Sequence, residues 1–255
     1  MITDLTTSTT ITGTMPTIAM ITTTTTVIAT TPIRRMARRG MCTGRTVGMA
    51  DPQLLRLLTW LSPAFPVGAF AYSHGLERAI HDNTIRDRAT LVVWLSDLLA
   101  QGSGWNDAVL CAASWRGEDV AELAEAMAGS RERHLETTLQ GDAFAQAVAP
   151  WTGEASPAPY PVAVGRAARD QNIALDAVLT AYSHAFASNL VQAAVRLVPL
   201  GQRDGVAALA ALEPVILDTA SRASHSTLDD LGTATVLSDI AAMRHETQYS
   251  RVFRS

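Results

Sequence analysis

The chain has 255 residues, of which 47% are hydrophobic and 17% charged, and its formal net charge is −4. That is enough apolar sequence for one sizeable core or at most two small ones. The acidic balance does not suggest a nucleic-acid binder, and no apolar run reaches the roughly 18–20 residues that cross a bilayer. We therefore expect a globular protein that binds neither nucleic acid nor membrane.

All 20 basic residues are arginines, and this excludes two kinds of chemistry. A P-loop needs a lysine on the nucleotide phosphates, and Schiff-base catalysis needs a reactive lysine. The two cysteines, Cys42 and Cys111, are too few for a disulfide framework or a four-cysteine zinc site, and they fit a cytosolic setting. We do not expect the chain to hydrolyse a nucleotide by itself.

Residues 1–50 differ from the rest of the chain. Threonine makes up 15 of the first 31 residues, five arginines follow, and Asp4 is the only acidic residue of the segment. This composition is similar to that of an organelle transit peptide. However, nothing in the segment can bury an apolar face, so we interpret it as disordered, or as upstream sequence from a misplaced start codon. The folded domain is expected to span residues 51–255.

In the folded part, apolar residues recur with helical spacing and never alternate as they do in a strand. The sequence predicts an all-α single domain of about ten helices around a long buried central helix, Ile173 to about Val198, on which His184 is expected to be a core histidine. The other expected helices are 52–61, a short one after Ser73, Asp87 to about Ala100, Trp105–Arg116, Glu118–Ala128, Glu132–Ala149, 160–170, Ala207–Leu212 and Val215–Arg222. Residues 150–161 are expected to form a loop.

The least generic passage is Leu61–Glu77, which reads LSPAFPVGAFAYSHGLE and which we call the elbow. Pro63 ends the preceding helix, Pro66 fixes a second φ angle, and Gly68 permits a conformation closed to other residues. Ser73 can cap the next helix. Two interpretations remain open: a connector whose aromatic residues belong to the core, or a partly exposed surface for a partner, with Phe65, Phe70 and Tyr72 around the breakers.

One group of residues has the composition of a metal site. His74, Glu77 and His81 fall within about 60° of one helix face, and imidazole and carboxylate suit nickel and zinc. The alternative is a solvated helix face. His245-Glu246 has the start of HExxH, but position 249 is Tyr, so that motif fails. There is no GxSxG, and the cysteines carry no catalytic signature.

Two further segments are distinctive. Arg196–Gln202 reads RLVPLGQ, in which the end of the long helix is followed by Pro199, Gly201 and the amide of Gln202. The alternative to a functional motif is that these residues only terminate the helix. Met243–Ser255, MRHETQYSRVFRS, is the C-terminal tail, and a frayed end is its alternative. Arg and Tyr in this tail are residue types enriched at binding hot spots. We predict that a partner orders the tail and that the tail contributes little to the fold itself.

The elbow, RLVPLGQ and the ending SDIAAMRHETQYSRVFRS together resemble the UreF family of urease accessory proteins over roughly residues 52–255, with YPVAVG and NLVQAAVR fitting the same pattern. The resemblance implies an all-helical, cytoplasmic homodimer without enzymatic activity of its own. Members bridge UreD (also called UreH) and the GTPase UreG, gate GTP hydrolysis by UreG, and so couple it to nickel insertion into the urease apoprotein.

The resemblance also implies which residues bind partners. It implies no firmly bound cofactor, only action within a nickel- and GTP-dependent complex. The alternatives are a nickel-binding carrier that uses His74, Glu77 and His81, and a helical enzyme whose site leaves no motif. The implied partner-binding residues are Pro66, Gly68, Phe70, Tyr72, Ser73, Gly75 and Glu77 from the elbow, and Arg244, His245, Glu246, Tyr249, Arg251 and Arg254 from the tail.

Overall fold

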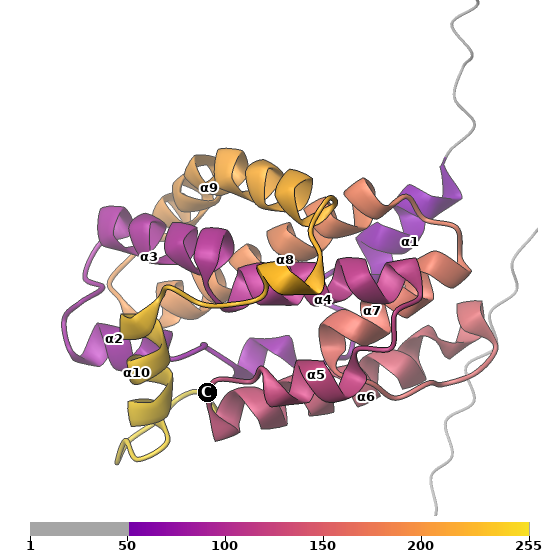
Figure 1. Ribbon diagram of the computed structural model, residues 1–255. Helices are drawn as coiled ribbons and strands as arrows, with labels where there is room; N and C mark the ends of the chain where they lie inside the picture. The colour runs from indigo at the N-terminus through magenta and orange to yellow at the C-terminus, as the bar shows by residue number, and fades with distance from the viewer. Residues whose placement is uncertain (1–50, 255) are drawn as a thin grey trace, which may run out of the picture. The chain divides into compact units, whose positions relative to one another are not determined.

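The computed structural model describes residues 51–254, which form ten α-helices, two 3-10 helices and no strand (Figure 1). The all-α prediction is confirmed there, and the segment expected to be disordered, 1–50, lies outside the described residues. None of the helices in this range is both long and apolar enough to span a membrane. In chain order the elements are α1 Pro52–Trp60, η1 Ala69–Ala71, α2 Leu76–His81, α3 Arg88–Gln101, α4 Ser103–Arg116, α5 Ala121–Ala126, α6 Arg131–Thr152, α7 Tyr160–Asp170, α8 Leu175–Leu197, α9 Gln202–Ala223, η2 Leu228–Asp230 and α10 Val236–His245.

Capping residues set several helix starts where the sequence predicts them. The Asp51 carboxylate accepts the N–H of Gln53 at 2.9 Å before α1. Asp87 and Thr90 form a reciprocal capping box that opens α3. By contrast, α2 begins at Leu76 rather than directly after Ser73, because Gly75 in a left-handed conformation occupies the N-cap position.

Two prolines expected to end helices lie inside them. We expected separate helices before and after Pro214, but α9 is continuous, and α6 runs through Pro150 to Thr152. A proline removes one backbone hydrogen bond and crowds the carbonyl one turn earlier. Pro214 lies on the exposed side of α9, where water can satisfy the freed carbonyl, while the opposite side packs on α8 and α3.

The long helix α8 is central, as predicted, because it touches α1, η1, α2, α3, α4, α7 and α9. Its N-terminal half packs in a cluster with α4 and α7, and its C-terminal half packs in a second cluster with α2, α3 and α9. However, α8 is not apolar on all sides. His184 is exposed, so the expectation of a core histidine is wrong. One side of the central helix is therefore open.

Candidate functional site

The elbow combines both interpretations left open by the sequence. Gly68 has φ +73° and introduces the single turn η1. Before the turn, the Phe65 ring packs on Phe144 with centroids 5.7 Å apart, and after it Tyr72 is buried. On the turn itself, Phe70 is 67% exposed. The elbow is thus anchored in the core and presents one aromatic ring to solvent.

The C-terminal tail docks directly on the elbow. The N–H of Arg254 donates to the carbonyl of Ala71 at 2.7 Å, and the Arg254 side chain hydrogen-bonds Tyr72. The Phe253 ring is buried, with the Arg196 guanidinium 5.9 Å from its centroid, and Arg196 also donates to the carbonyl of Phe70 at 3.2 Å. Three segments that the sequence singled out separately therefore form one surface, the elbow–tail surface, defined by Phe70, Arg196, Val252 and Arg254.

This arrangement corrects our expectation for the tail. We predicted that a partner orders it and that it contributes little to the fold. Instead α10 ends at His245, Phe253 belongs to the core cluster of α8 and α9, and Tyr249 is fully exposed. Sequence spacing gave no signal for this, because the pocket that buries Phe253 is built by distant segments.

A buried histidine links the tail to two helices. The Nε2 of His245 lies 3.2 Å from Glu77 of α2, and its Nδ1 lies 2.7 Å from Glu132 of α6. Arg251 donates to the other oxygen of Glu132 at 2.6 Å. The ring of His245 has no exposed surface. These four side chains fix α10 and the tail against the first turns of α2 and α6.

The proposed metal cluster does not assemble. Because α2 begins at Leu76, His74 precedes the helix, with φ +52°, and its Nε2 lies 2.8 Å from Glu136. Glu77 faces the tail, and the exposed His81 lies beside Asp82 at 3.3 Å. Across residues 51–254, no three His, Cys, Asp or Glu side chains are grouped so that they could hold a metal ion.

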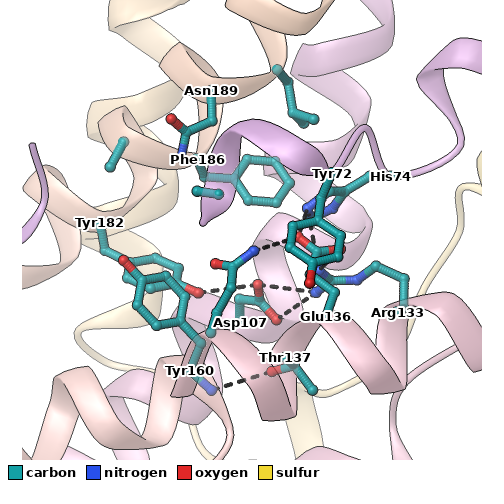
Figure 2. A pocket seen from close by; sticks show the side chains of 14 residues that line it. Tyr72, His74, Asp107, Arg133, Glu136, Thr137, Tyr160, Tyr182, Phe186 and Asn189 are labelled. Atoms are coloured by element: carbon teal, nitrogen blue, oxygen red, sulfur yellow. Dashed lines mark hydrogen bonds and ion pairs between the residues drawn. The ribbon is translucent and has the colours of Figure 1, made fainter. Parts of the chain in front are cut away.

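Behind the elbow lies a small polar pocket of about 30 Å³ between η1, α4, α6, α7 and α8 (Figure 2). Arg133 lies 2.9 Å from Glu136 and 3.3 Å from Asp107. The hydroxyl of Tyr182 donates to Asp107 at 3.1 Å, and the amide of Gln140 donates to Glu136 at 2.9 Å. This network was not predicted from the sequence. The signal for it was the presence of ionisable residues on helix faces that are otherwise apolar.

Burial and charge act against each other in this pocket. Burial alone would raise the pKa of Glu136, but His74 and Arg133 outweigh it and lower the pKa to about 2. For Asp107 burial prevails, and its pKa is raised although Arg133 and His74 oppose the shift. Glu136 is therefore a fixed negative charge held between His74 and Arg133.

Most of the residues that the family resemblance implied fall into two groups, buried and exposed. Buried side chains support the surface from within, whereas exposed ones can touch a partner. Glu246 is intermediate, and its carboxylate accepts the N–H of Arg131 at 2.8 Å. Tyr72, Ser73, Gly75, Glu77 and His245 are buried, Gly68 is half-buried, and Pro66, Phe70, Arg244, Tyr249, Arg251 and Arg254 are exposed.

Two glycines of the elbow are expected to respond differently to substitution by alanine. Gly75 has φ +74°, and a Cβ there would lie 2.5 Å from the backbone nitrogen of Ala242, whereas Gly68, at φ +73°, has open space around it. Gly68→Ala should cost only the left-handed strain of about 1–2 kcal/mol. Gly75→Ala adds a backbone collision and should push α10 away from α2. Urea unfolding of both variants checks this, and equal losses would contradict it.

The fold and the surface define an all-helical protein whose distinctive feature is a contact surface built from an elbow and a docked tail. A family model described as UreF matches residues 85–213. Urease accessory protein UreF 1 of Brucella anthropi is 54% identical, with 79% of this chain and 94% of the relative covered. UreF 1 of Brucella canis is 56% identical with the same coverage, and UreF of Mesorhizobium japonicum is 55% identical with 79% and 96% covered. The chain belongs to the UreF family, as its motifs predicted.

Proposed function

We propose that the chain is a non-catalytic assembly factor that acts in the cytoplasm during urease maturation. In this proposal it bridges the UreD/UreH homologue and the GTPase UreG and gates GTP-dependent nickel insertion into the urease apoprotein. The relatives are named urease accessory proteins, which supports a role in urease assembly. The absence of lysine from the chain supports a partner as the source of GTP hydrolysis.

The observation that carries the proposal is the elbow–tail surface. Phe70 and Val252 are 67% and 72% exposed, Phe70 on η1 and Val252 in the tail segment that Arg254 joins to Ala71 of η1. Arg196 and Arg254 beside them form no ion pair with any carboxylate within residues 51–254. Aromatic rings and arginines are typical of interface hot spots, and guanidinium groups that face no carboxylate in their own chain favour a partner that presents carboxylates. We propose that this surface contributes to binding of both the UreD and the UreG homologue.

The test is co-purification with each partner, with and without GTP and nickel. Phe70→Ala should weaken binding by about 30-fold, the factor that corresponds to a hot spot of about 2 kcal/mol. Val93→Ala on α3 is the control, because Val93 is similarly exposed, at 62%. Wild-type affinity of the Phe70 variant for both partners would contradict the assignment. In the same preparation, stoichiometric nickel binding that His74→Ala abolishes would favour the carrier alternative instead.

We propose that the chain acts as a homodimer through a second surface. A groove of about 850 Å³ runs between α1, α8 and α9, and its walls are mainly apolar. Leu54, Leu58 and Leu217 line it and are 53%, 65% and 58% exposed. The leucines that line the groove are thus themselves exposed in a single copy. A second copy related by two-fold symmetry could place its leucines against this groove, while the leucines of the first copy pack against the groove of the second. This arrangement favours self-association.

A further inference from the structure

Glu77 makes three contacts with the C-terminal part of the chain although it lies in the first turn of α2. One carboxylate oxygen accepts the N–H of Val252 at 2.8 Å, and the other accepts the N–H of Phe253 at 2.8 Å. The second oxygen also lies 3.2 Å from Nε2 of His245. Glu77 itself is only 6% exposed. It is therefore poorly placed to touch a partner, in contrast to the role that the family resemblance implied.

The contacts of Glu77 hold the backbone of the tail at two consecutive residues. Its oxygens accept the N–H groups of Val252 and Phe253, and burial of the Phe253 side chain in the core cluster selects the register in which these two residues meet Glu77. The Glu77 carboxyl group that accepts both bonds is itself buried, and hydrogen bonds in a low-dielectric environment are stronger than those in water. One residue further along, Arg254 reaches the carbonyl of Ala71. The position of Arg254 beside Phe70 thus depends on Glu77.

We infer that Glu77 is a positioning residue that holds the C-terminal tail in the register in which Val252 and Arg254 complete the elbow–tail surface. The inference rests on the proposed function for its consequence, partner binding, but the positioning itself can be measured without a partner. Glutamine in place of Glu77 keeps the shape but replaces one acceptor oxygen with an NH₂ donor. That donor would face the N–H of either Val252 or Phe253, so the pairing would be lost on one side.

The first experiment measures amide hydrogen exchange on the full chain without partners. In Glu77→Gln, the amides of Val252 and Phe253 should exchange at least tenfold faster than in wild type, while those in the middle of α8 keep their rates. Glu122→Gln is the matched control, because Glu122 is an exposed glutamate in the first turn of α5. Should Glu77→Gln fail to fold, Val252→Pro removes one donor from the tail side and should accelerate exchange at Phe253. Unchanged tail exchange in the folded variant overturns the inference.

The second experiment separates positioning from general destabilisation. Glu77→Gln and a chain lacking residues 252–255 should each weaken partner binding, and the two changes combined should weaken it no more than the deletion alone. Additive losses, or wild-type affinity despite a loosened tail, overturn the positioning role. If the wild-type chain binds neither homologue, the proposed function fails, whereas the exchange result still decides whether Glu77 fixes the tail.

Discussion

Replacement of Arg133 with alanine is expected to destabilise the folded chain by about 3–5 kcal/mol, the range for breaking a buried ion pair by removing one partner. Arg133 lies between Glu136 and Asp107, all three are buried or nearly so, and the variant would leave both carboxylates without their guanidinium. Urea denaturation followed by circular dichroism at neutral pH measures the change.

The matched control is another arginine–carboxylate pair at the surface. Arg166 lies 3.1 Å from Asp119, but the Asp119 side chain is 89% exposed. Arg166→Ala should therefore cost no more than about 1 kcal/mol. A loss below 1 kcal/mol in Arg133→Ala would mean that water reaches the pocket behind the elbow and screens its charges. Since the network holds His74, which is part of the elbow, the variant should also weaken partner binding, even at temperatures where it remains folded.

Features set by local chemistry were predictable from the sequence. Asp51 and Asp87 cap the starts of α1 and α3 through hydrogen bonds to backbone N–H groups two or three residues further on. Gly68 lies in the left-handed region, as its position among prolines suggested. The elbow itself could be singled out because its breakers and aromatic residues lie within one short stretch. Helical periodicity likewise identified α8 as the longest run, to within two residues at its start and one at its end.

Features that depend on distant segments were not predictable. The burial of Phe253 needs α8, α9 and Arg196 around it, and no pattern near the C-terminus encodes them. His184 was assigned to the core because α8 is apolar, but the side of α8 that faces solvent is decided by where α1 and α9 lie. The predicted cluster of His74, Glu77 and His81 assumed one helix through all three, and a two-residue difference in its start sends the side chains to different neighbours.

The exposed leucines of α1 lead to the other large expected effect, on the oligomeric state. Leu54 and Leu58 are one turn apart on α1 and line the groove together with Leu217 of α9. A contiguous apolar patch left open in a single copy is a feature that marks interaction sites. In the proposed homodimer each of these leucines occurs in the contact twice, once from each copy. A single substitution therefore changes both halves of the interface.

Leu58→Glu should therefore convert the dimer to a monomer, with a dimer dissociation constant raised by at least 100-fold, because two carboxylates would be buried in an apolar contact without partners. Sedimentation velocity over a range of concentrations measures the constant, and the melting temperature at low concentration should change little, since Leu58 is 65% exposed in the single chain.

Leu135→Glu on α6 is the control, because Leu135 is also exposed, at 51%, but does not line the groove. A wild-type chain that is monomeric at all concentrations would remove the groove as a dimer interface. A Leu58→Glu variant that stays dimeric would place the interface elsewhere on the surface.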